Sequence, residues 1–179
     1  MSILKVARLG HPALRQPARR VVPSELVDSA TQRLIDDMFE TMREYQGIGL
    51  AAPQVHVGLR LFVAGADDPD AGMSPVVMVN PEISPIGEAT EEDWEGCLSI
   101  PDIRGRVPRR AEILVRSLDR HGREHTTTES GFPARVIQHE TDHLDGVLFL
   151  DRMSQFDSLT YLAEYDRYVD STEASTDDE

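Results

Sequence analysis

The stretch H-E-T-D-H at residues 139–143 carries the side chains best suited to chemistry. On a helix, His139 and His143 are four positions apart and project from one face, so both imidazoles can bind one metal ion. Glu140 is adjacent enough to reach a water molecule at that metal, as in the H-E-x-x-H arrangement of hydrolytic metal sites. The apolar residues on either side predict a largely buried helix, where an unpaired polar trio would be costly. A metal site is therefore favoured over a chance pair of surface histidines.

A catalytic site of this type needs a third protein ligand and one open position for water. Phe149 stands where a metzincin would supply its third histidine, so that subclass is excluded. A carboxylate about twenty residues beyond His143, Glu164 or Asp166, would give a thermolysin-like peptidase. The other candidate is Cys97, a soft thiolate donor that a metal ion would deprotonate.

Two further stretches bear on this choice. Cys97 lies in E-G-C-L-S-I-P at residues 95–101, where Gly96 allows close backbone approach and Pro101 is expected to end strand pairing. The stretch G-I-G-L-A-A-P-Q at residues 47–54 offers a shallow wall for a substrate backbone and the amide donor of Gln54. Taken alone, the second stretch is better explained as a tight turn between a helix and a strand.

In combination, the three stretches make the sequence similar to the peptide deformylases. G-I-G-L-A-A-P-Q, E-G-C-L-S-I-P and Q-H-E-T-D-H-L-D-G match the three signature motifs of that family, in order and at the usual separations. The resemblance covers roughly residues 3–153, including the opening I-L-K-V-A-R-L-G-H-P-A-L-R. It implies a hydrolase that removes the formyl group from N-formylmethionine at the start of nascent polypeptides.

The resemblance also implies roles for individual residues. Cys97, His139 and His143 would hold one divalent metal ion, most commonly Fe²⁺, with Zn²⁺, Ni²⁺ or Co²⁺ able to take its place. Glu140 would move protons, and the Gln54 side-chain amide and the Leu98 backbone N–H would stabilise charge on the formyl oxygen. The residues expected to bind the peptide or its methionine side chain are Ile48, Gly49, Gly96, Arg104, Phe132 and Val136. For Phe132 and Val136, ordinary core packing is an equally good interpretation.

Asp93 is a departure from the family pattern, because family members often have an apolar pocket residue there. An intact Glu140 and an intact Gln54 argue against a non-catalytic metal-binding homologue, since neither is needed merely to hold a metal.

Periodicity predicts how these motifs are positioned. Apolar residues at spacings of three or four predict a helix over residues 24–46, capped by Ser24 and stopped at Gly47. A second helix is expected from Pro133 to Gly146, and a third from about Phe156 to Val169, capped by Ser154. Short apolar runs predict strands at residues 59–65, 76–80, 112–118 and 123–129, the last two joined by a hairpin turn at D-R-H-G. The predicted fold class is α+β, with mixed or antiparallel strands around a central metal-binding helix. We expect a single domain over residues 1–169, followed by an acidic disordered tail at residues 170–179.

Composition limits the partners. The formal net charge of −14 and pI near 4.7 disfavour nucleic acid and anionic membrane surfaces, and no apolar run approaches the roughly 20 residues of a membrane span. The single cysteine excludes an intrachain disulfide and fits the cytoplasm. The resemblance to the peptide deformylases implies N-formylmethionyl nascent peptides as the partners. Docking on the ribosome through a basic C-terminal helix is not supported, because residues 151–179 contain nine acids and two bases.

Overall fold

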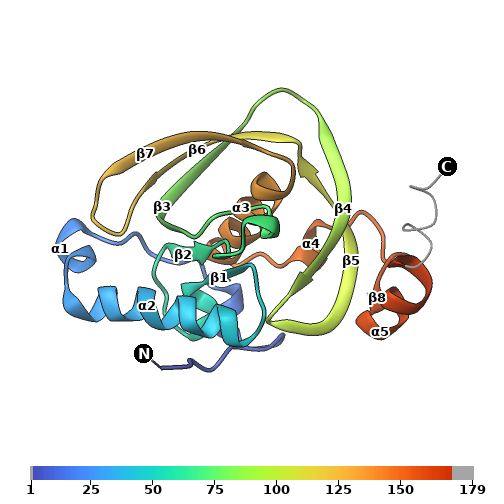
Figure 1. Cartoon of the computed structure of the whole chain (residues 1–179), viewed down its shortest axis with the longest axis horizontal. Helices are drawn as coiled ribbons and strands as arrows, with labels where there is room; N and C mark the ends of the chain where they lie inside the picture. The colour runs from blue at the N-terminus through green and yellow to red at the C-terminus, as the bar shows by residue number, and fades with distance from the viewer. Residues whose placement is uncertain (1, 171–179) are drawn as a thin grey trace.

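Two antiparallel sheets and a helix that contacts both of them form the body of the protein (Figure 1). The computed structural model describes residues 2–170. The larger sheet has the order β1-β2-β3-β6-β7 and the smaller one β4-β5-β8. The strands are β1 (Gly49–Ala51), β2 (Leu61–Ala64), β3 (Val76–Pro85), β4 (Thr90–Cys97), β5 (Ile100–Arg110), β6 (Glu112–Leu118), β7 (Glu124–Ser130) and β8 (Thr160–Tyr161). The predicted α+β class is confirmed by this arrangement.

The helix predicted over residues 24–46 is divided in two, so that prediction was wrong in its first turn. A short α1 (Pro23–Leu26) precedes α2 (Ser29–Glu44), and the Asp28 side chain caps α2 by accepting from the Ala30 N–H at 3.2 Å. Ser24 is inside α1 and caps nothing. The buried face of α2 packs on β1 and β2, and the left-handed residue that ends it is Gln46 (φ 55°), not Gly47.

The hairpin of β6 and β7 has the predicted turn. The Gly122 N–H donates to the Asp119 carbonyl at 3.0 Å, and the two strands pair from Glu112 and Ser130 to Leu118 and Glu124. β3 extends beyond its predicted end at Asn80, through Pro81, to Pro85, with a register irregularity between Val79 and Glu82 where the proline removes a ladder donor.

The hairpin of β4 and β5 was not predicted as a pair of strands. Its sequence is polar and carries no apolar alternation, yet it pairs almost continuously from Thr90 and Arg110 to Gly96 and Arg104. Pro101 lies inside β5 instead of ending the pairing. This hairpin supplies two of the three strands of the smaller sheet, with β5 in the middle and β4 at one edge, and it places Cys97 at its turn.

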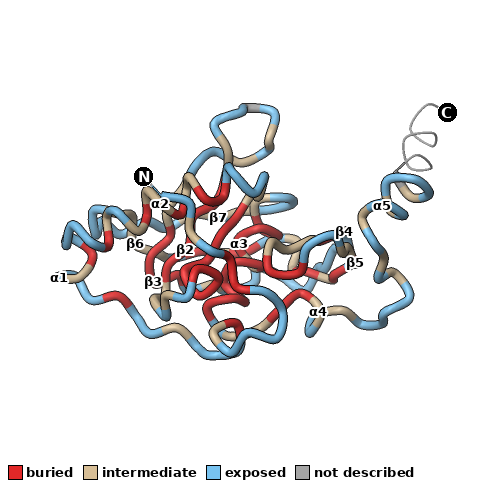
Figure 2. The backbone as a smooth tube through the Cα atoms, turned by 90° about the horizontal axis from the view of Figure 1, so that it is seen from below, coloured by how far each residue is buried: buried red, intermediate tan, exposed pale blue. Residues whose placement is uncertain are grey.

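Helix α3 (Gly131–Leu144) occupies the centre of the molecule, as predicted. Figure 2 shows buried backbone concentrated here and in the surrounding strands. Ala134, Ile137 and Leu144 are fully buried against the larger sheet, and burial of each large apolar side chain contributes about 1.5–3 kcal/mol. The helix begins at Gly131, two residues before Pro133, and ends before Gly146, whose φ of 74° suits a glycine.

The predicted third helix, from about Phe156 to Val169, was wrong in its first part, because the chain is helical only from Leu162 onward. After α4 (Phe149–Arg152), the chain forms β8 on the edge of β5, then α5 (Leu162–Tyr165) and a π-helical turn, η4 (Asp166–Asp170). Ser154 caps no helix. The expected acidic tail, residues 170–179, lies outside the described residues except for Asp170. None of the described helices is long and apolar enough to cross a lipid bilayer.

Candidate metal centre and active-site cleft

Three potential metal ligands come together where β4 ends beside α3. Cys97 is the last residue of β4, and His139 and His143 lie one turn apart on α3. One ligand atom from each side chain lies within 4.8 Å of the other two, and Cys97 Sγ is 3.2 Å from His143 Nε2. Among the described residues, no other group of three His, Cys, Asp or Glu side chains could hold a metal ion.

The alternative third ligands lie elsewhere. Glu164 is in α5, its side chain is half exposed, and its carboxylate is 3.9 Å from the Arg167 guanidinium. Asp166 follows it in the π-helical turn and is exposed. Neither belongs to the histidine group, so the thermolysin-like alternative is not supported.

The donor set fits a divalent transition metal. Burial alone would raise the pKa of the Cys97 thiol, but the adjacent His143 and His139 rings lower that pKa well below its ordinary value. The two rings therefore favour the thiolate, which is the form of cysteine that binds metals. One thiolate and two imidazoles suit iron, zinc and similar ions and leave a position open for water.

The orientation of His139 is fixed by a buried carboxylate. His139 Nδ1 lies 2.9 Å from Glu95 Oε2. Burial would raise the pKa of Glu95, but its bonds to Arg109 and His139 lower that pKa far below its ordinary range, so the carboxylate can only accept. Nδ1 must then carry the proton, which leaves Nε2 of His139 free to act as the metal ligand.

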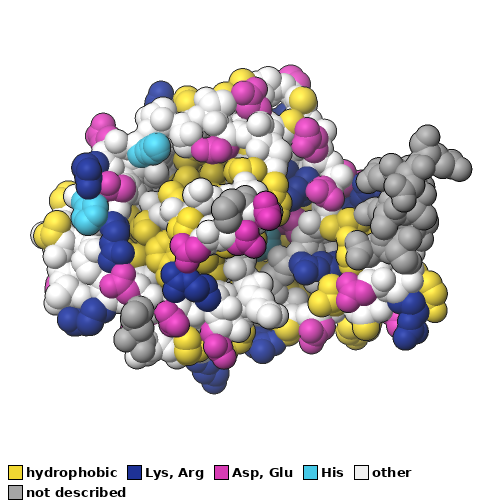
Figure 3. Space-filling view, in the orientation of Figure 1, with side chains coloured by type: hydrophobic (Ala, Val, Ile, Leu, Met, Phe, Trp, Pro, Cys, Tyr) yellow, Lys and Arg dark blue, Asp and Glu magenta, His cyan; other side chains and the backbone are white. Residues whose placement is uncertain are grey.

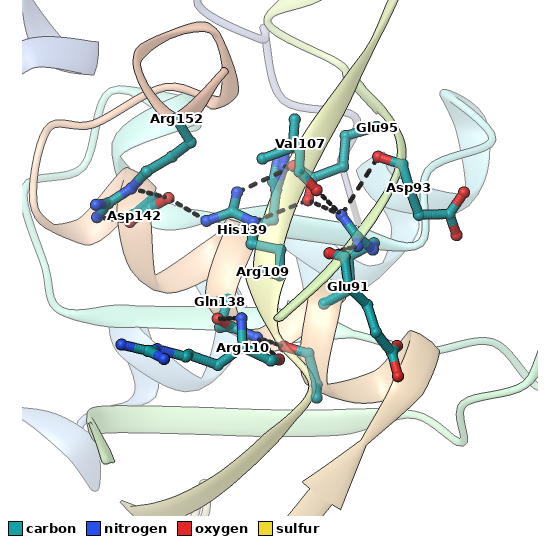
Figure 4. Close-up of polar contacts among 12 residues, drawn as sticks. Glu91, Asp93, Glu95, Val107, Arg109, Arg110, Gln138, His139, Asp142 and Arg152 are labelled. Carbon is teal, nitrogen blue, oxygen red and sulfur yellow. Dashed lines mark hydrogen bonds and ion pairs between the residues drawn. The ribbon is translucent and has the colours of Figure 1, made fainter. Parts of the chain in front are cut away.

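Glu95 is the centre of a buried network of charges (Figure 4). It accepts from Arg109 Nε at 2.8 Å, Arg109 Nη2 at 3.0 Å and Arg135 Nη1 at 2.9 Å. Arg109 Nη1 also donates to Asp142 Oδ2 at 2.5 Å, and Asp142 accepts from the half-exposed Arg152. Each buried charge has an opposite partner, which is the condition under which buried ions are tolerated.

The Glu140 side chain packs directly against Gly49 of β1. A Cβ atom at Gly49 would lie 2.2 Å from Glu140 Oε1, so only glycine leaves room for this carboxylate. Glu140 is 4% exposed, and its Oε2 has no hydrogen-bond partner among the described residues. Burial raises the pKa of Glu140 to about 7, which suits a group that takes up and returns a proton near neutral pH.

Gln54 is buried beside the sulfur. Its Oε1 accepts from the Ala51 N–H at 2.7 Å, which fixes the amide orientation, and its Nε2 donates to Ser99 Oγ at 3.2 Å and lies 3.6 Å from Cys97 Sγ. Leu98, in the turn between β4 and β5, packs so closely on Gly47 that a Cβ there would be 2.7 Å from Leu98 Cδ1. The structure thus brings Gln54 and Leu98 to the metal ligands.

A cleft of about 590 Å³ opens onto these groups. Figure 3 shows hydrophobic side chains gathered near the centre of one face of the molecule and charged ones spread around them. The expected substrate-binding residues that line the cleft are Ile48, Gly49, Gly96, Arg104, Phe132 and Val136. Val136 is 5% exposed and also belongs to the core, whereas Phe132 is 46% exposed and has no such packing role. The Asp93 side chain is exposed and is not part of the cleft wall, where Trp94 and Arg135 lie instead.

Sequence reasoning missed several groups around the site. Glu95 entered the sequence analysis only as the first residue of the E-G-C-L-S-I-P stretch, and its partners Arg109, Arg135 and Asp142 were not singled out. Asp142 lies within the H-E-T-D-H stretch, three positions from His139 and therefore one helical turn away, which was an available signal. Nothing in the sequence indicated Leu162, which also lines the cleft.

Comparison with known proteins agrees with this geometry. Residues 3–158 match the family model described as polypeptide deformylase. Peptide deformylase 2 of Nostoc sp. (strain PCC 7120) is 46% identical over 158 residues, covering 84% of this chain and 86% of that protein. The peptide deformylase of Xylella fastidiosa (strain M12) is 47% identical over 154 residues, covering 86% and 89%.

Solved structures give the same result. The Met-Ala-Ser-bound class I type b peptide deformylase from Acinetobacter baumannii superposes with a TM-score of 0.80 at 41% identity, covering 86% of this chain and all of that one. The Thermotoga maritima peptide deformylase gives 0.79 at 39% identity, covering 87% and 100%. The family model and these relatives span most of the described fold, and the chain therefore belongs to the peptide deformylase family of enzymes.

Proposed function

We propose that the protein is a metal-dependent hydrolase that removes the formyl group from N-formylmethionyl nascent peptides. The products are formate and a free amino terminus. Family membership supports the reaction class. The observation that carries the proposal is the buried Glu140 carboxylate, with one oxygen unpartnered among the described residues, on the same cleft as Cys97, His139 and His143.

We propose that Cys97 Sγ and the Nε2 atoms of His139 and His143 hold the metal ion. Fe²⁺ is our first choice, and Zn²⁺, Ni²⁺ and Co²⁺ are compatible with the same donors. When bound, the ion would polarise the formyl oxygen and make a water molecule acidic near neutral pH. Glu95 keeps the His139 ring in the ligating orientation throughout.

Glu140 moves the proton. Its carboxylate takes a proton from the attacking water as the oxygen bonds to the formyl carbon. The same proton then goes to the methionine nitrogen as the carbon–nitrogen bond breaks, so the amine leaves neutral. The raised pKa of Glu140, caused mainly by burial, fits both halves of this cycle.

Gln54 and Leu98 stabilise the negative charge that develops on the formyl oxygen. The Gln54 Nε2 amide lies 3.6 Å from Cys97 Sγ, next to the metal position, and its other contacts prevent it from turning away. The Leu98 backbone N–H is the second donor. Preorganised donors of this kind each contribute about 2.7–4 kcal/mol to transition-state stability.

The peptide is expected to lie extended between two sheet edges. β1 is an edge of the larger sheet and β4 an edge of the smaller one, and both line the cleft. Ile48, Gly49 and Gly96 would pair with the peptide backbone, as in strand addition. The methionine side chain would enter between Ile48, Phe132 and Val136, and Arg104 would contact the peptide further along.

Other parts of the proposal concern location and partners. We place the enzyme in the cytoplasm, acting on nascent peptides without direct contacts to nucleic acid or membrane. Because the C-terminal sequence is acidic, we expect the protein to bind ribosomes only weakly at physiological salt. Co-sedimentation of the purified protein with ribosomes at sub-micromolar affinity would refute this part.

The function is tested by measuring formate release from formyl-Met-Ala-Ser by protein loaded with iron or nickel under anaerobic conditions. Wild type should be active, Glu140→Gln should lose at least a hundredfold in kcat while keeping its metal, and Glu88→Gln, whose side chain is 98% exposed, should match wild type. Cys97→Ser should lose metal by elemental analysis and Glu164→Ala should retain it. An active Glu140→Gln would overturn the assigned proton transfer, and an inactive wild type would overturn the function.

A further inference from the structure

A second cavity lies behind α3, on the side of the helix turned away from the metal centre. It has a volume of about 670 Å³, and residues of β3, β5, α3 and α4 form most of its wall. Gln138, Thr141 and Asp145 of α3 line it at spacings of three and four, whereas His139 and Glu140 line the metal cleft. The two cavities share no lining residue. Figure 1 shows α3 between β3 and β5, which explains how one helix serves both.

The charged residues around this cavity include more arginines than acids. The arginines are Arg60, Arg109, Arg110 and Arg152, and the acids are Glu82, Asp142 and Asp145. Four positive and three negative charges leave a balance of +1, although the whole chain carries −14. Glu82 is also paired at 2.7 Å with Arg20, which does not line the cavity. The cavity is therefore a place of local positive charge in an acidic protein.

Three of the four guanidinium groups keep N–H groups that bond to no other described residue. The Arg60 side chain is 18% exposed and donates to Asp145 at 2.5 Å through Nη1 alone. Arg110 donates to the Glu88 carbonyl at 3.0 Å, also through Nη1 alone. Arg152 uses Nε and Nη2 in its bonds to α3, which leaves Nη1. Open guanidinium N–H groups bind oxyanions through short, charge-assisted hydrogen bonds.

Surrounding contacts fix the walls that carry these groups. The Arg109 guanidinium lies between Asp142 and Glu95, and its three nitrogens all donate to them, so Arg109 supplies charge but no open donor (Figure 4). The Gln138 side chain accepts from the Arg110 N–H at 3.0 Å and donates to the Arg110 carbonyl at 2.9 Å. These bonds tie the end of β5 to α3. A site held in place before binding loses less entropy when a ligand enters.

A buried hydroxyl on the helix adds an uncharged donor. Thr141 lines the cavity and is 8% exposed, and its Oγ1 has no hydrogen-bond partner among the described residues. A buried polar atom of this kind costs free energy until a partner satisfies it. Threonine hydroxyls can both donate and accept, so a ligand oxygen in the cavity would satisfy Thr141. This observation is independent of the arginines and also indicates a ligand.

The donors suit a phosphate group. Its several oxygens can accept from guanidinium groups on three sides, which the two oxygens of a carboxylate do less well. A phosphate ion fills only part of the cavity, and Pro81, Ile83 and Pro108 give the remainder an apolar wall. We propose that the cavity behind α3 is a binding site for a phosphate group, carried by a small organic molecule or present as the free ion. The site is separate from the proposed deformylase reaction and does not depend on it.

The test measures binding of inorganic phosphate, phenyl phosphate and phenol to the full-length, nickel-loaded protein by isothermal titration calorimetry. Both phosphates should bind, and phenol, which lacks the phosphate group, should not. Tighter binding of phenyl phosphate than of the free ion assigns the site to an organic phosphate, and equal affinities assign it to the ion. Phosphate can also coordinate nickel, so the titration is repeated with metal-free wild type, where the Kd should be unchanged.

Variants place the binding in this cavity. Arg110→Gln should weaken phosphate binding about tenfold and Thr141→Val about fivefold, because they remove a charged and a neutral hydrogen-bond donor. The matched control Arg123→Gln removes the same charge from a side chain that is 76% exposed beside the β6–β7 turn, and it should bind as wild type. Without phosphate, Thr141→Val should be at least as stable as wild type in urea, because it removes an unpartnered hydroxyl.

Four results would overturn the site. The first is no binding of either phosphate to wild type in the millimolar range. The second is binding that disappears with the metal, which would place the phosphate at the metal centre. The third is equal weakening in Arg110→Gln and Arg123→Gln, which would show a general effect of charge. The fourth is a Thr141→Val variant that is as stable as wild type and binds phosphate with unchanged affinity.

Discussion

Replacing Glu95 by glutamine removes one negative charge from the buried network around His139 and keeps the side-chain shape. In the folded protein Glu95 is 5% exposed and accepts four hydrogen bonds, from Arg109, Arg135 and His139. Glutamine has one acceptor oxygen and an NH₂ group that faces donors, so Arg109 and Arg135 would lose buried partners. Breaking a buried ion pair from one side costs about 3–5 kcal/mol, and we expect Glu95→Gln to lose this much unfolding free energy.

The assay is urea unfolding of the metal-free protein at pH 7, followed by titration with Zn²⁺ or Ni²⁺. Metal affinity should fall by about 10- to 100-fold, because the His139 ring is no longer held by a carboxylate. The matched control is Glu92→Gln on the same strand, where the carboxylate is 3.9 Å from Arg106 and both side chains are 46% exposed, and it should change stability by less than about 1 kcal/mol. A loss below about 1 kcal/mol in Glu95→Gln, or equal effects in the two variants, would refute the view that the network supports the site.

Three further predictions concern the metal and the groups beside it. Removing the metal with a chelator should lower the free energy of unfolding in urea by up to about 4 kcal/mol. The bound ion would join Cys97 to His143, 46 residues apart, and so act as a crosslink in the unfolded chain. An unchanged unfolding midpoint would contradict this prediction. Gly49→Ala should lower kcat at least about tenfold by displacing the Glu140 carboxylate, whereas Gly58→Ala, which has open space around it, should not. In the metal-free protein, folding raises the pKa of Glu140 from 4.5 to about 7, so the carboxyl destabilises the fold above pH 7, and this cost disappears as pH falls through 7 toward 4.5. Glu140→Gln should therefore be more stable than wild type by up to about 3 kcal/mol at pH 8 and nearly equal to it at pH 4.5, and a difference independent of pH would refute this.

The parts of the fold that could be predicted are those in which local sequence and burial agree. The helix carrying His139 and His143 alternates apolar and functional residues at helical spacing and ends at a glycine, so its position was predictable within two residues. The β6–β7 hairpin has an apolar run followed by a turn sequence. In both cases short-range patterns determine the structure.

The parts that could not be predicted depend on contacts between distant residues. The β4–β5 hairpin is rich in charged residues, and its buried Glu95 and Arg109 are neutralised by each other and by residues of α3. No local sequence pattern reveals these long-range ion pairs. The C-terminal residues have a composition typical of a helix. Pairing of Thr160 and Tyr161 with β5 stabilises this part of the chain more than a short isolated helix would. In both places tertiary contacts outweigh local propensity.

The same reasoning applies to the site. The three ligand positions and Glu140 could be identified because their residue types and spacing are distinctive. The arginines and Asp142 around them are common surface residues in most sequences, and only the structure shows that Arg109 and Arg135 are buried. Leu162 lies 19 residues beyond His143, outside all three motifs.

The two free edges that face the cleft have a consequence for solubility. An unpaired strand edge is a template for any extended chain, including another copy of the same protein. Here β1 is only three residues long, and Arg135 occupies the carbonyls of Glu91 and Asp93 on β4, so little of either edge is open to self-association. Concentrated or heated samples of an Arg135→Ala variant should therefore aggregate more readily than wild type. A peptide bound in the cleft should reduce this aggregation, because it pairs with the free edges.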